Sequence, residues 1–109
     1  VDNNNLQIAG TVEEVNSPYP IPEKFAASGW HVIEIDGHDF DQMEKALAEA
    51  KTVKGKPTMI VAKSVKGKGV SYMENNVSWH GSAPKQEQYD IGMKELGDAL
   101  AALEVQVNG

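Results

Sequence analysis

Two strand-like segments on either side of one helical segment limit the folds that this chain can adopt. Residues 30–35 are rich in β-branched and aromatic side chains, and residues 57–62 form a nearly all-apolar run. Such a run is typical of a parallel strand that is covered on both faces. Strand, helix and strand with short connections indicate a crossover between parallel strands. We therefore expect an α/β fold in which these strands form part of a doubly wound, mainly parallel sheet.

The helical segment between the two strands carries its own start and stop signals. Asp39 is expected to cap it, with Gln42 completing a capping-box pattern. Gly55 supplies a stop and Pro57 prevents the helix from continuing. Its apolar side chains recur at helical spacing and predict the face that is buried: Phe40, Met43, Leu47 and Ala50.

The other segments follow from proline, glycine and apolar spacing. We expect the end of a strand at residues 1–2, a loop at 3–10, a short helix at 22–28, and a long loop at 63–85. Residues 86–107 form a helical tail that is expected to pack on the domain or on a partner. The tail carries a narrow apolar seam: Tyr89, Met93, Leu96, Leu100, Leu103 and Val107.

Composition excludes several classes of protein. With 109 residues the chain is one domain or a piece of one. It has no cysteine, so neither a disulfide nor a cysteine-based zinc site can form. No apolar run approaches the ~20 residues of a membrane helix, and the polar start is unlike a signal peptide, so we expect a cytoplasmic protein. A net charge of −6 argues against a nucleic-acid binder.

The lysines are concentrated in one part of the chain. Six of them lie between Lys51 and Lys68, with no acidic residue among them. The first three suit the end of a helix, while Lys63, Lys66 and Lys68 follow a strand, where ligand-binding loops usually lie. From the charge pattern alone, a run of lysines more often indicates a solvated loop.

Residues 66–84 are the most informative segment for function. Lys66 and Lys68 stand among glycines, which let a backbone approach a ligand closely, and His80 follows in a Trp-His-Gly turn. Loops at residues 3–10, 36–39 and 63–85 all leave the carboxyl ends of expected strands, where α/β sheets bind ligands. With residues 2–8, this segment indicates half of a site for a diphosphate and its metal.

These motifs resemble those of transketolases. Asp-Asn-Asn-Asn-Leu-Gln-Ile-Ala-Gly at residues 2–10 is similar to the second part of the family's thiamine diphosphate motif, and residues 29–39 resemble the next strand and turn. Lys-Pro-Thr at 56–58, Lys-Gly-Lys-Gly at 66–69 and Trp-His-Gly-Ser-Ala-Pro at 79–84 match in order and spacing. The resemblance implies that residues 1–109 are the carboxyl-terminal part of one diphosphate-binding domain, and it suggests one piece of a split transketolase.

The resemblance also implies the residues of a cofactor site. Magnesium, or calcium, takes the side-chain oxygen of Asn4 and the backbone oxygen of Leu6, with Asn3 and Asn5 as alternatives to Asn4. Thiamine diphosphate is bound by Asn4, Lys66 and His80, and His80 is also the catalytic candidate next to the sugar. Some relatives carry a lysine where this chain has Ser82. His38 is explained by the helix entry, and His31 is expected to be structural.

The implied reaction transfers a two-carbon ketol unit from a ketose phosphate to an aldose phosphate. The expected partners are an amino-terminal segment with Gly-Asp-Gly and a pyrimidine-binding subunit or domain, within a homo- or hetero-oligomer. We expect neither activity nor a stable domain from residues 1–109 alone. Two alternatives stay open: a fragment of another thiamine diphosphate enzyme, such as 1-deoxyxylulose-5-phosphate synthase or an oxo-acid dehydrogenase component, and a non-catalytic subunit of the same fold.

Overall fold

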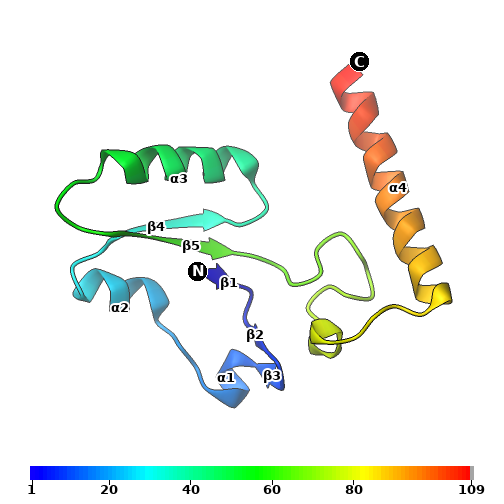
Figure 1. The fold of residues 1–109 in the computed structure, drawn as a ribbon, viewed down its shortest axis with the longest axis horizontal. Helices are drawn as coiled ribbons and strands as arrows, with labels where there is room; N and C mark the ends of the chain where they lie inside the picture. The colour runs from blue at the N-terminus through cyan, green and yellow to red at the C-terminus, as the bar shows by residue number, and fades with distance from the viewer. Residues whose placement is uncertain (109) are drawn as a thin grey trace. The chain divides into compact units, whose positions relative to one another are not determined.

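The computed structural model describes residues 1–108, which form two compact units. The first unit is Val1–Ser64, and the second starts at Val65. Figure 1 shows a small sheet with helices in the first unit, and a winding loop followed by one long helix in the second. We describe each unit by itself.

A three-stranded parallel sheet forms the centre of the first unit. Strand β5 (Thr58–Lys63) lies between β1 (Asp2–Asn3) and β4 (His31–Asp36), and both neighbours run parallel to it. Helix α3 (Phe40–Thr52) connects β4 to β5. The expected crossover between parallel strands is therefore confirmed.

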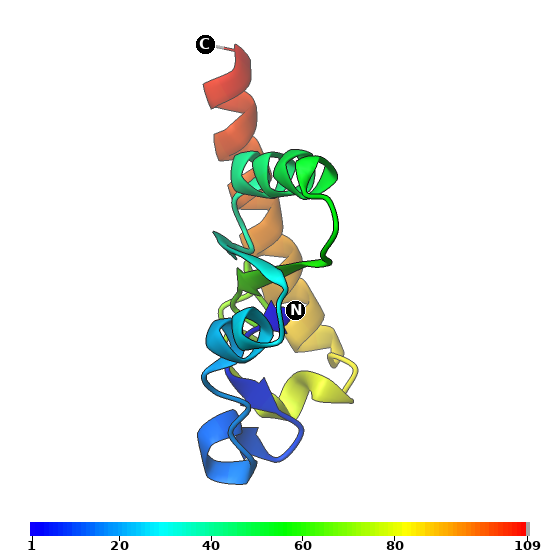
Figure 2. The same cartoon turned by 90° about the vertical axis from the view of Figure 1, so that its left-hand side faces the viewer.

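Helices cover both faces of this sheet. Figures 1 and 2 show α2 (Ile21–Ala27) on one face and α3 on the other. The buried apolar side chains of the described residues come from all three layers, with Ile21 in α2, Val61 in β5 and Ala46 in α3. The covered central strand explains why residues 57–62 are nearly all apolar. This arrangement confirms the α/β fold, and the expected helix at residues 22–28 is correct to within one residue.

Helix α3 has the expected N-cap, but the capping box is not formed. The Asp39 carboxylate accepts a hydrogen bond from the backbone N of Gln42 at 3.1 Å. The Gln42 side chain bonds elsewhere, because its Nε2 donates to the Asp39 carboxylate at 2.8 Å and its Oε1 accepts from the backbone N of Asp36 at 2.9 Å. Gln42 thus ties the end of β4 to the start of the helix.

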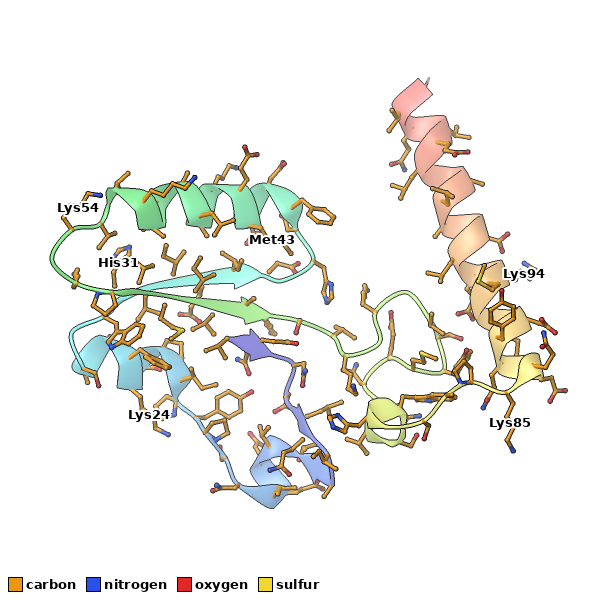
Figure 3. All side chains as sticks on the ribbon, viewed as in Figure 1. Lys24, His31, Met43, Lys54, Lys85 and Lys94 are labelled. Atoms are coloured by element: carbon orange, nitrogen blue, oxygen red, sulfur yellow. The ribbon has the colours of Figure 1, made fainter. Side chains whose placement is uncertain are left out.

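The predicted buried face of α3 is partly wrong. Phe40 is 82% exposed and Leu47 is also exposed, whereas Ala46, absent from the predicted stripe, is 2% exposed. Met43 is half-buried and lies on the sheet side of α3 (Figure 3). Positions 43, 46 and 50 fit helical spacing as well as the predicted set does, and a small alanine at the centre lets the helix approach the sheet closely.

The segment after β1 has more structure than the expected loop. Strands β2 (Leu6–Gln7) and β3 (Gly10–Thr11) pair antiparallel, and the short helix α1 (Val12–Val15) follows directly. Thr11 and Glu14 cap this helix reciprocally in a capping box. The Thr-x-x-Glu pattern at residues 11–14 was the available sequence signal.

The second unit consists of turns, a short 3₁₀ helix η1 (Val77–His80) and helix α4 (Gln86–Asn108). Helix α4 confirms the helix expected over residues 86–107. All six seam side chains, Tyr89 to Val107, are exposed in the structure. Packing of the tail on the domain or on a partner stays a prediction. Within residues 1–108, no helix is both long and apolar enough to cross a membrane.

Candidate functional site

The loops expected to bind ligand start at one edge of the sheet. Asn3 at the end of β1 pairs with Lys63 at the end of β5, and the backbone N of Ser64 donates to the Asn3 carbonyl at 3.3 Å. On the other side of β5, the backbone N of Gly37 donates to the Lys63 carbonyl at 2.7 Å. A Cβ on Gly37 would lie 3.0 Å from that same oxygen, so a larger residue would crowd this contact.

The three consecutive asparagines have different hydrogen bonds. The Asn4 side-chain oxygen accepts from the backbone N of Leu6 at 2.9 Å, which closes a local turn. The Tyr19 hydroxyl lies 2.8 Å from the side-chain oxygen of Asn3 and 3.3 Å from that of Asn5. Asn5 adopts a φ of 61°, a left-handed conformation that asparagine tolerates. Tyr19 therefore hydrogen-bonds to Asn3 and Asn5, the two alternative metal ligands, and makes no such bond to Asn4.

The oxygens of Asn4 and Leu6 suit a hard divalent cation. Amide and backbone oxygens are typical ligands of magnesium and calcium. A carbonyl oxygen has two lone pairs, so the bond from Leu6 leaves Asn4 able to make a second contact. Residues 1–108 contain no group of three histidine, cysteine or acidic side chains that could hold a metal.

In the second unit, the lysine–glycine segment folds back on itself. The backbone N of Asn75 donates to the Lys66 carbonyl at 3.0 Å, and the backbone N of Gly69 donates to the Glu74 carboxylate at 3.0 Å. The Lys68 ammonium lies 3.8 Å from the same carboxylate. Within residues 1–108, Lys66 has no ion-pair partner, so the two lysines differ in their surroundings.

Gly67 has a strict structural requirement within this segment. Its φ is +74°, and a Cβ placed on it would lie 2.5 Å from the backbone oxygen of Met73. Only glycine combines this backbone conformation with so close an approach. Gly67 therefore fixes the conformation of the backbone between Lys66 and Lys68.

His80 is the last residue of η1 and is exposed. The Asn76 side-chain oxygen caps η1 by accepting from the backbone N of Ser78 at 3.1 Å and from the Ser78 hydroxyl at 2.6 Å. Ser82, the departure from the pattern of some relatives, donates its hydroxyl to the Ser78 carbonyl at 3.0 Å. Ser82 thus closes the turn that follows His80.

The other two histidines have local roles. His31 Nε2 lies 2.6 Å from the Glu49 carboxylate, which links the start of β4 to α3. Figure 3 shows His31 beside β4, at the end of the strand away from the turn into α3. His31 thus lies in a strand, as expected, and its structural role stays a prediction. The backbone N of His38 donates to the Asp36 carboxylate at 2.9 Å, in the turn that enters α3.

The structure brings Asn4 and Leu6 together in the first unit, and Lys66 and His80 into one segment of the second. Tyr19 and Glu74 are residues that sequence reasoning missed. Neither belongs to a motif that a sequence would reveal. Tyr19 acts through hydrogen bonds to Asn3 and Asn5, and Glu74 through its hydrogen bond from Gly69.

Comparison with known proteins gives consistent matches. A family model described as "Transketolase, thiamine diphosphate binding domain" matches residues 1–106. The chain is 36% identical, over its whole length, to one subunit of the apulose-4-phosphate transketolase of Phocaeicola vulgatus, and spans 39% of that subunit. It is 39% identical, over 87% of its length, to the 6-deoxy-6-sulfo-D-fructose transketolase subunit SqwG of a Clostridium species, and spans 34% of it.

A solved structure agrees with these sequence matches. The crystal structure of a transketolase from Campylobacter jejuni superposes with a TM-score of 0.79 and 32% sequence identity. The match covers 88% of this chain and 15% of that one. The chain is thus similar to one section of a much longer protein.

Proposed function

Because this chain belongs to the transketolase family, within its thiamine diphosphate-binding domain, we propose that it contributes the magnesium–diphosphate half of a transketolase active site. The proposed enzyme transfers a two-carbon ketol unit from a ketose phosphate to an aldose phosphate. The two relatives named as transketolase subunits support a division of the enzyme between chains. The proposed partners are a segment with Gly-Asp-Gly and a pyrimidine-binding subunit or domain.

The observation that carries this proposal is the shared edge where β1 and β5 end. Asn4 directly follows Asn3 of β1, and Asn3 is hydrogen-bonded to Ser64, which directly follows β5. The metal candidate and the segment that carries Lys66 and His80 therefore start from neighbouring strand ends. This edge is where open α/β sheets bind ligands.

Each candidate residue has a role that fits its chemistry. The Asn4 side-chain oxygen and the Leu6 backbone oxygen hold magnesium, or calcium. The Lys66 ammonium and the His80 imidazole bind the diphosphate, as cation and hydrogen-bond donor, and His80 also faces the sugar. Thiamine diphosphate supplies the carbanion chemistry, while these side chains bind and orient it. We assign none of the described residues to activation of the aminopyrimidine, so the chain requires its partner for activity.

Replacement of His80 tests the proposal in the assembled enzyme. Loss of a charge-assisted hydrogen bond costs about 1.5–3 kcal/mol, so His80→Ala should weaken thiamine diphosphate binding roughly 10- to 150-fold. His31→Ala is the matched control, because it removes an imidazole from the far end of β4 and should leave cofactor affinity unchanged. Wild-type affinity and turnover in His80→Ala would contradict the role of His80, and would mean that His80 is only a turn residue and that the diphosphate is held elsewhere.

Replacement of the asparagines one at a time tests the metal position. Asn4→Ala should weaken the magnesium-dependent part of cofactor binding, measured by titration calorimetry, and should lower the free energy of unfolding by only about 1 kcal/mol, through loss of the bond from Leu6. Asn3→Ala and Asn5→Gly are the controls, and glycine is chosen because Asn5 has a positive φ. If Asn3→Ala or Asn5→Gly, and not Asn4→Ala, reduced the magnesium dependence, the assignment would move to that residue.

A further inference from the structure

Helix α4 holds the lysine–glycine segment through a side chain that has no place in the motifs above. The Glu95 carboxylate accepts two hydrogen bonds from Ser71, one from its backbone N at 2.7 Å and one from its hydroxyl. Ser71 lies two residues beyond Gly69, in the same segment as Lys66. Hydrogen bonds to a carboxylate are about twice as strong as those between neutral groups.

A second contact joins α4 to the next residue of the segment. The Tyr72 hydroxyl donates to the Gln88 carbonyl at 2.7 Å. Gly92 makes room for this contact, because a Cβ at Gly92 would lie 3.1 Å from the Tyr72 hydroxyl oxygen. Gly92 costs helix stability, about 1 kcal/mol relative to alanine, and the approach of Tyr72 explains its presence.

Tyr72 also connects to the turn that presents His80. Its ring centroid lies 5.1 Å from that of Trp79, with the planes inclined by 54°. Its carbonyl accepts from the Asn76 side chain at 3.2 Å, and Asn76 caps η1. The contacts of Ser71 and Tyr72 with α4 therefore connect this helix to the turn that ends at His80, and the bond from the Asn75 backbone N to the Lys66 carbonyl closes the other end of the segment.

We propose that Glu95 and Gly92 of α4 are positioning residues, which hold residues 66–80 in the shape that binds the diphosphate. This inference rests on the proposed function, and it adds residues that touch neither cofactor nor substrate. Residues behind a ligand-binding shell typically change metal or ligand affinity by about 10- to 100-fold when they are replaced. Helix α4 thereby determines how well Lys66 and His80 are ordered for binding.

The test uses the assembled enzyme and two measurements. Glu95→Ala should raise hydrogen exchange at the Ser71 amide roughly 10- to 100-fold, because that amide loses its charged acceptor. The same variant should weaken thiamine diphosphate binding, with magnesium present, about 10-fold, while turnover recovers at saturating cofactor. Gly92→Ala should act in the same direction, since it displaces Tyr72.

The controls separate positioning from a general loss of stability. Asp98→Ala removes a carboxylate from the same helix, but its partner is Lys94 at 2.6 Å, so exchange at Ser71 and cofactor affinity should stay at wild-type values. Glu95→Gln keeps one acceptor oxygen and should recover part of the affinity that Glu95→Ala loses. If Glu95 had a purely structural role, Glu95→Ala would lower the unfolding midpoint of the protein, and Glu95→Gln would not recover cofactor affinity.

Two outcomes would overturn the inference. In the first, exchange at Ser71 is unchanged in Glu95→Ala. In the second, exchange rises but cofactor affinity stays at the wild-type value. Suppose that one of these outcomes is observed for Glu95→Ala. If His80→Ala still weakens cofactor binding in the same assay, only this inference fails and the proposed function stands. If neither variant affects binding, both the inference and the proposed function fail.

Discussion

The two units of this chain are stabilised by different kinds of contact. In Val1–Ser64, a parallel sheet lies between two helices, and this unit contains all three buried apolar side chains of the described residues: Ile21, Ala46 and Val61. In the second unit, turns are held to one another and to α4 by side-chain hydrogen bonds from Ser71, Tyr72 and Asn76. The apolar seam of α4 is exposed.

This difference has consequences for stability and for binding. Burial of apolar area is non-directional and tolerates small shifts, whereas a hydrogen bond depends on distance and angle and has a net value of about 1 kcal/mol. We therefore expect the first unit to resist local opening more than residues 65–85 do. Segments that adjust to ligands are commonly drawn from such less stable regions.

The largest expected effect comes from the core of the first unit. Val61 is 2% exposed in the central strand, so Val61→Ala should lower the free energy of unfolding by about 2–3 kcal/mol, through lost burial and a cavity. Phe40→Ala is the control, since Phe40 is largely exposed on α3 and should change stability by no more than about 0.5 kcal/mol. Denaturant titration of the full-length protein measures the loss of unfolding free energy in both variants. Equal losses would mean that Phe40 is buried, as the predicted apolar face of α3 requires.

An intermediate effect is expected at the turn of the second unit. Gly67→Ala should cost about 2 kcal/mol, because the side chain meets the Met73 carbonyl and the backbone keeps a positive φ. Gly55→Ala has the same kind of φ, +76°, with no atom near its Cβ, and should cost about 1 kcal/mol. If the two losses were equal, the turn would yield to the added methyl group, and the second unit would be more adaptable than its hydrogen bonds indicate.

The smallest effect concerns the pH dependence of two carboxylates, one in each unit. The backbone hydrogen bond from Gln42 holds the pKa of Asp39 below its ordinary 3.8, and the hydrogen bonds from Ser71 hold the pKa of Glu95 below its ordinary 4.5. A lowered pKa stabilises the folded state fully above the ordinary value, and this contribution is lost as pH falls through the lower, folded value. Both carboxylates therefore favour folding at neutral pH and lose this effect in acid.

Amide variants isolate this effect. The stability difference between wild type and Asp39→Asn, or Glu95→Gln, should be constant between about pH 6 and about pH 8, and should change only on acidification below the ordinary pKa values. Unfolding midpoints as a function of pH measure it. A difference that does not change in acid would mean that the carboxylate is not hydrogen-bonded in solution.

Much of the fold could be predicted because its signals are local. The parallel strands, the N-cap at Asp39 and helix α4 all followed from periodicity, capping residues and glycine or proline stops. The buried face of α3 could not be predicted, because Phe40 and Leu47 fit the helical period as well as Ala46 does. Side-chain size favoured the wrong face, and the close packing of helix on sheet selected the alanine.

The candidate residues followed from motif order alone, but their local hydrogen bonds did not. Three consecutive asparagines are equivalent in the sequence. The structure separates them, because Tyr19 contacts Asn3 and Asn5, while Asn4 closes its own turn with Leu6. Lys66 and Lys68 are likewise equivalent in the sequence pattern but have different surroundings in the structure, because the Glu74 carboxylate lies beside Lys68 and not beside Lys66.

By itself, the sequence determined the order and type of the main strands and helices and the family of the chain, because residue spacing and motif order are recorded along the chain. It did not reveal the short elements β2, β3, α1 and η1. Only the tertiary structure decided which side chains are partners. Tyr19 and Asn3 are 16 positions apart, and Ser71 and Glu95 are 24 apart. Contacts at such separations depend on where each element begins and how it is rotated, and no local pattern specifies either of these.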